Sequence, residues 1–350
     1  MSANGNRFSK MSIDERIKVA EKIFILHPQL KKILTRFSEC HKSFRRSVEP
    51  QCLFLTAPTG AGKTTVATSY VAKFPRRVTE RGTVIRVLTS VVPAIPGVKS
   101  IATRLLYDLG VPNPSQGSID NQTYRLFESL ADRGVEMIIL DEIQHVYRID
   151  RRQAQIAVDW LKSLVVHTGV PMVAMGTPES DDILHANDQF ARRFSRMILE
   201  PFGWGPEEQE NEFRTFLGFL DEMLPLDSRS GLSSRGTALR IHHATKGVVG
   251  DVMVLVRKAA ILALQEGAEK ITLDHLTNVY EERWGVAEKA RMGSGRQHSF
   301  RTDVQELAEG LRTMQPIFKM TTAAGVRIRP KRDRYSNLGV EFIDVVRTAE

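Results

Sequence analysis

Cysteine is scarce in this sequence, and long apolar runs are missing from it. The 350 residues include 2 cysteines, Cys40 and Cys52, which are too few for a disulfide framework and lack the second pair of ligands that a zinc site needs. No apolar run approaches the roughly 18 residues that span a membrane, and the first residues lack the apolar core of a signal peptide. We therefore expect a cytoplasmic protein with no membrane partner, in which both cysteines are structural.

Compositional bias is absent as well, although the charge is unevenly distributed. Hydrophobic residues make up 42% and charged residues 26% of the sequence, which is typical of a folded globular protein and excludes wholesale disorder. Residues 1–50 contain 11 Lys and Arg against 5 Asp and Glu, and residues 291–350 contain 11 against 7. Basic ends of this kind bind nucleic acid or acidic partners in some proteins and form a solvated surface in others.

The apolar patterns predict an α/β domain between helical segments. Ser12 and Glu15 match a capping box before one helix, and a second helix is expected after Pro28. Short apolar runs separated by helix-sized stretches then indicate a parallel sheet with crossover helices. After Pro201 the periodicity becomes helical. The expected strands are 52–57, 84–88, 135–140, 172–175 and 197–199, and the expected later helices are 206–224, 237–244, 249–265 and 272–284.

These patterns predict four parts of the chain. Residues 1–50 form a basic helical N-terminal extension, and residues 51–203 form a three-layer αβα core around the parallel sheet. A small all-helical lid follows at 204–290. Residues 291–350 form a basic, partly flexible tail, with a short amphipathic stretch at 303–314 and a basic run at 327–334.

A phosphate-binding loop follows the first expected strand. Residues 52–66 read CLFLTAPTGAGKTTV, an apolar strand, a glycine-containing loop and the start of a helix. Gly60 and Gly62 allow the backbone amides to turn toward a phosphate, while Lys63 supplies positive charge and Thr64 a hydroxyl ligand for Mg²⁺. Ala57 stands where the G-x-x-x-x-G-K-[ST] pattern begins with glycine. The predicted ATP-binding residues are Pro58, Thr59, Gly60, Ala61, Gly62, Lys63, Thr64 and Thr65.

An acidic pair ends the third expected strand. Residues 135–142 read VEMIILDE, and in a nucleotide site the first acid of such a pair orients Mg²⁺, which assigns Asp141 beside Thr64 to the metal. Glu142 is then positioned to polarise the water that attacks the γ-phosphate. The alternative is a strand end whose acids cap the next helix. Together with the loop, the pair predicts an ATPase that uses ATP and Mg²⁺.

Two further elements refine the predicted site. Thr177 follows the strand at 172–175, where a residue that senses the γ-phosphate or the attacking water is expected, although it could be a simple strand-end cap. The run QFARRFSR at 189–196 places Arg193 and Arg192 before the last strand. An arginine offered from there to a neighbouring subunit would stabilise transition-state charge, so that hydrolysis would be completed at subunit interfaces. Arg193 is the first candidate, and a solvated or intrachain pair is the alternative.

In this order, these elements resemble the AAA+ ATPases, and within them the TnsC/TniB regulators of DNA transposition. The resemblance covers about residues 25–290 and is carried by APTGAGKTT, VEMIILDEIQHV, VPMVAMGTPES and QFARRFSRMILEPF. It implies an ATP-dependent protein that assembles with itself, as a ring or helical filament, on double-stranded DNA. It also implies two protein partners, a target-selecting protein and the transposase.

The resemblance further implies that the loop and helix after the second strand face DNA. It assigns backbone contacts with little sequence preference to Lys99, Ser100, Arg104 and Ser118. The lid departs from the family, which often has an arginine after the helix-start glycine, because Asp251 follows Gly250 here. Either Arg257, two turns later, substitutes for that arginine, or lid sensing and turnover are weakened.

Two other functions fit the same motifs. One is an AAA+ ATPase of signalling or secretion that acts on protein partners without DNA. The other is a loader of the replication-initiator type, which should carry a winged-helix domain after the lid. The last 60 residues are too short and irregular for that domain. ATP-dependent binding to random-sequence duplex DNA separates the transposition regulator from the signalling ATPase.

Overall fold

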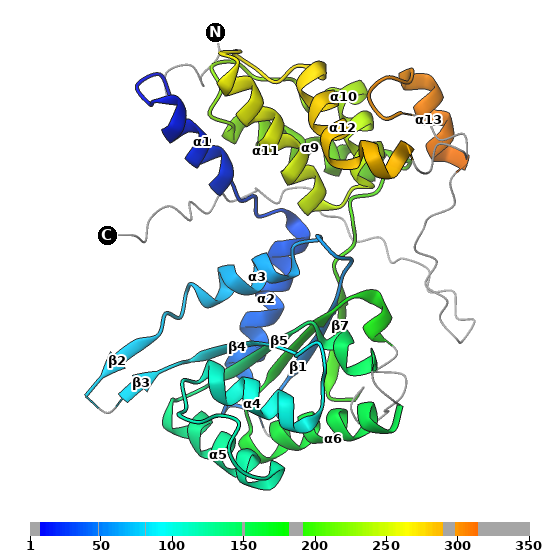
Figure 1. Cartoon of the computed structure of the whole chain (residues 1–350). Coiled ribbons are helices and arrows are strands. Elements are labelled where there is room, and N and C mark those ends of the chain that lie inside the picture. The colour runs from blue at the N-terminus through cyan, green and yellow to red at the C-terminus, as the bar shows by residue number, and fades with distance from the viewer. Residues whose placement is uncertain are drawn as a thin grey trace. The chain divides into compact units, whose positions relative to one another are not determined.

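A computed structural model describes residues 8–47, 49–80, 82–148, 151–181, 192–289 and 298–313. The chain splits into two compact units, one α/β (28–200) and one helical, which is formed by the residues up to 27 and from 201 on (Figure 1). The predicted extension is thus divided between the units after His27. The basic run 327–334 lies outside the described residues.

The α/β unit is built on a five-stranded parallel sheet in the order β4-β5-β6-β1-β7. Helices α4, α5 and α6 cover one face of the sheet, and α2 and α3 lie on the other (Figure 1). The strands are β1 (Cys52–Thr56), β4 (Val87–Val91), β5 (Met137–Asp141), β6 (Met172–Gly176) and β7 (Phe194–Ile198). The helices are α2 (Pro28–Ser43), α3 (Lys63–Val71), α4 (Val98–Asp108), α5 (Ile119–Asp132), α6 (Arg151–Thr168) and the 3₁₀ turns η1 (Ile143–Arg148) and η2 (Pro178–Ser180).

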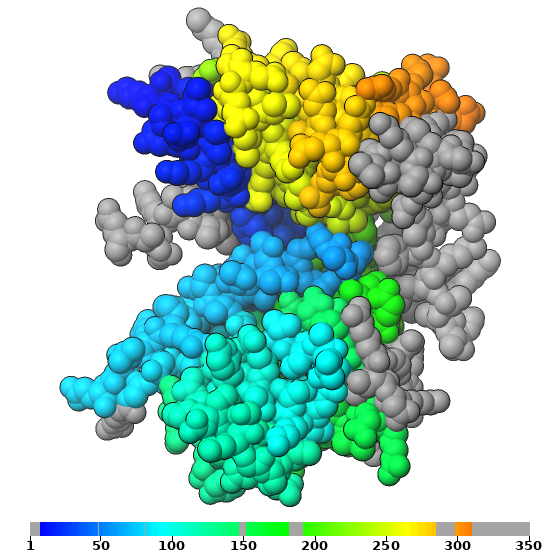
Figure 2. All heavy atoms as spheres, in the orientation of Figure 1, coloured from blue at the N-terminus to red at the C-terminus, as the bar shows by residue number. Residues whose placement is uncertain are grey.

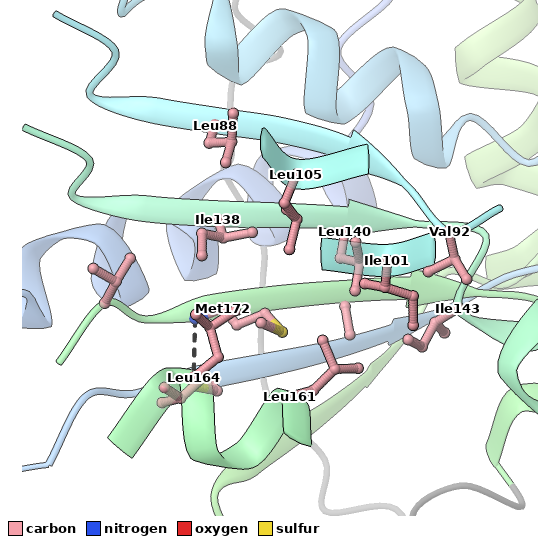
Figure 3. Close-up of a cluster of buried hydrophobic side chains, with 14 of the residues drawn as sticks. Leu88, Val92, Ile101, Leu105, Ile138, Leu140, Ile143, Leu161, Leu164 and Met172 are labelled. Atoms are coloured by element: carbon pink, nitrogen blue, oxygen red, sulfur yellow. Dashed lines mark hydrogen bonds between the residues drawn. The ribbon is translucent and has the colours of Figure 1, made fainter. Parts of the chain in front are cut away.

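The core of this unit forms because three central strands are apolar on both faces. Every residue of β1, β5 and β6 is buried, as expected for strands covered by helices on both sides. On one face, Ile138 and Leu140 lie opposite Ile101 of α4 and Leu161 of α6 (Figure 3). Burial also raises the pKa of the Cys40 thiol to about 12 and that of Cys52 to about 11, which fits the prediction that both are structural.

The prediction of a strand at 84–88 is wrong. Val84 instead pairs with Arg77 in an antiparallel hairpin of β2 (Arg77–Thr79) and β3 (Gly82–Val84), which extends from the body of the unit (Figure 2). Ile85 then donates its N–H to the Arg133 carbonyl, so the chain joins the main sheet only at Val87. The last strand begins three residues earlier than the apolar run at 197–199 suggested, because β7 is an edge strand with exposed polar residues in its middle.

The helical unit packs around one apolar core. Its helices are α1 (Ile13–Lys22), α9 (Glu207–Met223), α10 (Arg235–Thr245), α11 (Val249–Gln265), α12 (Leu273–Lys289) and α13 (Val304–Thr313). The predicted capping box opens α1, since Ser12 Oγ accepts from the Glu15 N–H and Glu15 accepts from the Ser12 N–H. Ile23 and Ile25, which follow α1, pack in this core with residues of α9 and α11. The predicted lid helices are confirmed to within three residues, apart from the end of α12, and α13 lies at the predicted amphipathic stretch.

Candidate nucleotide site

The predicted phosphate-binding loop joins β1 to α3 and has the backbone conformation that its glycines allow. Gly60 and Gly62 have φ angles of 81° and 104°, in the left-handed region that favours glycine. Gly62 is the N-cap of α3, and glycine has no side chain to accept from the first-turn amides. Those amides, of Lys63, Thr64 and Thr65, begin a helix that can bind an anion. The loop therefore fits a phosphate group.

Lys63 is held inside this loop by the loop's own carbonyls. Its side chain is buried, and Nζ donates to the Ala57 carbonyl at 2.6 Å and to the Pro58 carbonyl at 3.1 Å. Burial lowers the pKa of Lys63, while the nearby carboxylates of Asp141 and Glu142 oppose that shift. Ala57 is fully buried at the end of β1, where a methyl group is accommodated. The departure from glycine at this position thus leaves the loop intact.

The metal candidates Thr64 and Asp141 meet across the sheet edge. Strands β1 and β5 lie on either side of β6, and the loops after parallel strands share one edge of the sheet. Thr64 Oγ1 donates to Asp141 Oδ2 at 2.8 Å, and the other Asp141 oxygen accepts the Glu142 N–H at 2.8 Å. Hydroxyl and carboxylate oxygens are ligands that Mg²⁺ prefers. The donor set fits Mg²⁺, with Thr64 and Asp141 as the residues that would hold it.

Glu142 and Thr177 lie on either side of a residue that sequence reasoning missed. Glu142 adopts a left-handed backbone conformation (φ 59°), and its carboxylate accepts a short hydrogen bond from Nε2 of Gln144. Gln144 Oε1 accepts the backbone N–H of Thr177 at 3.2 Å. Thr177 is the N-cap residue of η2, at the end of β6. No spacing rule marks a glutamine two residues after an acid, so the sequence carried no signal for Gln144.

Arg193 and Arg192 lie at the opposite edge of the sheet. Arg193 immediately precedes β7, and β7 begins beside Cys52, the first residue of β1. The phosphate-binding loop follows the other end of β1, five residues on, which at about 3.3 Å per residue is roughly 16 Å away. Arg193 is half-buried, 3.9 Å from the exposed Glu49 carboxylate, and Arg192 is exposed. The structure therefore does not bring either arginine to its own chain's loop.

The four DNA candidates lie on α4 and at the start of α5. Lys99 is exposed in the first turn of α4, on the edge of the sheet that carries the phosphate-binding loop. Ser100 and Ser118 make local capping contacts, because Ser100 Oγ accepts the Gly97 N–H at 2.9 Å and Ser118 Oγ the Asn121 N–H at 3.2 Å. Arg104 is exposed and paired with Asp108 at 2.9 Å.

The two lid residues singled out in the sequence, Asp251 and Arg257, make contacts within the helical unit. Asp251, where the family often has arginine, lies 3.7 Å from Arg283, and burial raises its pKa. Arg257 donates a short hydrogen bond to the Ile23 carbonyl. Both residues are thus bonded inside the unit that carries them, and Asp251 cannot supply positive charge.

Solved structures show the same fold. The ORC1 protein of Aeropyrum pernix, solved in complex with DNA, has a TM-score of 0.57 at 21% identity, over 79% of this chain and 72% of that one. The Aeropyrum pernix ORC2 protein in its ADPNP–ADP complexes has a TM-score of 0.54 at 15% identity, over 76% and 71%. Cdc6p from Pyrobaculum aerophilum has a TM-score of 0.53 at 16% identity, over 76% and 70%. They confirm the predicted AAA+ fold, a parallel αβα sheet domain followed by helices.

Sequence comparison gives the family. No curated protein sequence matches the chain at a significant level. A family model described as bacterial TniB protein matches residues 16–204, which is more than half of the chain and contains every candidate residue of the nucleotide site. This agrees with the resemblance drawn from the motifs, and the chain belongs to the TniB family.

Proposed function

We propose that this protein is an ATP-dependent, DNA-binding AAA+ regulator of transposition. It assembles with itself on target DNA and links a target-selection protein to the transposase. The observation that carries the proposal is the TniB match, because its bounds, residues 16–204, include the loop, the acid pair, Thr177 and the arginine pair. Among the described residues, no helix has the length and apolar character needed to cross a membrane.

ATP hydrolysis is assigned to the edge of the sheet where the loop and acids meet. Lys63 exchanges the Ala57 and Pro58 carbonyls for phosphate oxygens, which compensate its buried charge better than neutral carbonyls do. Glu142 orients the attacking water and accepts its proton. Mg²⁺, held by Thr64 and Asp141, would neutralise charge on the phosphates.

The position of the arginine pair favours catalysis between subunits. Arg192 and Arg193 lie at the edge of the sheet opposite the phosphate-binding loop. To reach the loop of its own chain, either side chain would have to span the length of β1. Arg192 is exposed there and Arg193 is half-buried beside the exposed Glu49 carboxylate, so the loop of a second copy in a ring or filament can approach them. Arg193 then stabilises charge on the neighbour's γ-phosphate, so that turnover depends on assembly.

DNA binding is assigned to α4 and the start of α5. Lys99 is exposed there, and an ammonium group contacts phosphates without reading sequence. The Ser118 hydroxyl accepts from an amide and can still donate to a phosphate oxygen. The Ser100 hydroxyl also donates to the Ile95 and Gly97 carbonyls, and would have to exchange one of them for a phosphate oxygen. A regulator that uses many target sites needs contacts of this kind. The ORC1 neighbour of the same fold was solved with DNA, which supports DNA binding in general.

Binding to random-sequence duplex DNA tests the proposal. The wild-type chain is expected to bind with a nonhydrolysable ATP analogue and to form rings or filaments visible by negative-stain microscopy, whereas Lys63→Ala should do neither. Lys73→Ala is a matched control, because Lys73 is an exposed lysine beyond the end of the same helix. ATP hydrolysis without any ATP-dependent DNA binding would instead favour the signalling or secretion ATPase.

A further inference from the structure

We propose that Gln144 is a positioning residue for ATP hydrolysis, which fixes the Glu142 carboxylate and ties it to the end of β6. The inference rests on the proposed ATPase function and deepens it. Its side-chain amide spans two groups from different strands: Nε2 donates to Glu142 Oε2, and Oε1 accepts the Thr177 N–H at 3.2 Å. Both the donor and the acceptor of the Gln144 side-chain amide are therefore hydrogen-bonded.

Burial makes Gln144 suited to this role. The glutamine is 8% exposed, whereas the Glu142 side chain is 39% exposed. An exposed glutamate has several accessible rotamers, and holding it in one of them costs conformational entropy. Gln144 has lost that freedom by burial in the turn after β5. The buried Gln144 side chain thus restrains the exposed Glu142 side chain. The conformational entropy of Glu142 is therefore already reduced before the reaction begins.

The other neighbour of Glu142 cannot replace this hydrogen bond. Nδ1 of His145 lies 2.9 Å from the Val92 carbonyl, and since a carbonyl only accepts, Nδ1 carries the proton. In the neutral ring Nε2 is then an acceptor, and it lies 3.9 Å from Glu142 Oε2, beyond hydrogen-bond range. Gln144 is therefore the donor that holds the carboxylate, among the described side chains around it.

The link to Thr177 connects the carboxylate to the strand that lies beside β1. Strand β6 pairs with β1 up to Gly176, and the Ala57 N–H, at the start of the phosphate-binding loop, donates to the Gly176 carbonyl at 3.0 Å. The phosphate-binding loop is thus one backbone hydrogen bond away from the end of β6, which Gln144 connects to Glu142.

Two substitutions test the proposal in the full-length chain with ATP, Mg²⁺ and duplex DNA. Gln144→Met keeps the size of the side chain and removes both hydrogen bonds. Gln144→Glu keeps the acceptor for Thr177 and, when ionised, removes the donor to Glu142. We expect kcat to fall about 10- to 100-fold in both, as for loss of one hydrogen bond to a charged group, with KM and nucleotide affinity within about twofold of wild type.

Gln122→Met is the matched control. Gln122 is a fully buried glutamine of α5, whose Nε2 donates to the Pro114 carbonyl at 2.9 Å. Its substitution removes a comparable buried amide away from the site, so it should reduce thermal stability with kcat unchanged. In a Glu142→Gln background, Gln144→Met should have no further effect on the residual single-turnover rate, because the group it positions is already lost.

The outcomes separate this inference from the proposed function. Unchanged or raised kcat in the Gln144 variants, while the wild type hydrolyses ATP, overturns the positioning role alone. An equal loss of kcat in Gln122→Met, or a full additional loss in the Glu142→Gln background, also overturns it. Wild-type protein that binds duplex DNA but hydrolyses no ATP overturns the ATPase assignment, and the role of Gln144 with it.

Discussion

Two sets of buried polar side chains, one in each unit, have contrasting surroundings. In the α/β unit, Lys63, Asp141 and Gln144 are buried at one edge of the sheet, and each bonds to the loop or acids of the candidate site. In the helical unit, His27 and His242 are buried among aromatic rings, both in contact with Phe202.

The difference shows which buried polar groups are arranged for chemistry. Lys63 hydrogen-bonds neutral carbonyls, which are weak partners for a charge and can be exchanged for phosphate oxygens. Burial lowers the pKa of His27 and of His242 to about 4, so both are neutral packing rings at pH 7. Substitutions of Lys63, Asp141 and Gln144 should therefore change activity more than stability, and substitutions of the two histidines stability more than activity.

The largest effect is expected from the loop and the acid pair. Lys63→Ala should abolish nucleotide binding, because backbone amides alone do not compensate the phosphate charge. Glu142→Gln should keep nucleotide binding and lose hydrolysis by at least about 100-fold, the contribution of a general base. Titration with a fluorescent ATP analogue and steady-state phosphate release measure the two effects. If Glu142→Gln hydrolyses ATP like wild type, Glu142 has no catalytic role.

Arg193 should have a comparable effect that depends on assembly. Arg193→Ala is expected to lower kcat about 10³-fold, the lower end for an arginine finger, with nucleotide binding retained. Mixing it with Glu142→Gln subunits should restore some activity, because the mixed interfaces that pair an intact Glu142 with an intact Arg193 are complete. Arg192→Ala, in the same mixing series, shows which arginine acts. Absence of recovery despite demonstrated co-assembly would indicate an intrachain role for Arg193.

Gly247→Ala should chiefly destabilise the helical unit. A Cβ at Gly247, whose φ is +71°, would lie 2.0 Å from the Phe202 carbonyl oxygen, and Phe202 also donates its N–H to the Gly247 carbonyl. We expect the free energy of unfolding to fall by about 4 kcal/mol or more. Gly267→Ala is the control, since Gly267 has a φ of +70° with nothing described within 4 Å of an added Cβ, and should cost about 1 kcal/mol. Equal losses in denaturant unfolding would contradict the steric explanation.

The fold was predicted from the sequence, and so was the set of residues that the structure brings together at the candidate nucleotide site, because both depend on local patterns. The loop glycines lie beside Lys63 in sequence, and Asp141 and Glu142 are consecutive at the end of β5, so spacing within each motif sufficed. The order of the strands, the grouping of α1 with the later helices and the hydrogen bonds of Gln144 depend on long-range packing, which spacing does not encode. The strand at 84–88 was misplaced for the same reason, since the hairpin pairing of Val84 competes with the main sheet.

Acid should destabilise the helical unit through its buried histidines. His27 has a pKa near 6.5 when unfolded and about 4 when folded, so the unfolded state binds more protons between these values. The free energy of unfolding therefore keeps its full value above pH 6.5. It falls as the pH falls toward 4, and the total loss from His27 is about 3 kcal/mol. His27→Phe should flatten this dependence and keep the ring contacts with Phe202 and Phe216. A pH dependence of unfolding in His27→Phe that equals that of the wild type would contradict the assignment.

The smallest effect is expected at the DNA surface, where Lys99 and Arg104 are exposed and the other two candidates make local hydrogen bonds. Lys99→Ala should weaken ATP-dependent binding about equally on unrelated duplexes and flatten the slope of log affinity against log salt by about one unit per lost phosphate contact. Arg104→Ala should do less, because Arg104 is already paired with Asp108.

The control is deletion of residues 315–350, which lie outside the described part of the chain. We assign their basic run to a protein partner such as the transposase, so DNA binding and ATP hydrolysis should survive the deletion while transposition is lost. Salt-dependent binding isotherms on two unrelated duplexes measure both variants. If the deletion removes DNA binding and Lys99→Ala leaves the salt slope unchanged, the basic tail holds the DNA. The α/β unit would then contribute nucleotide chemistry and assembly, without the phosphate contacts assigned to α4.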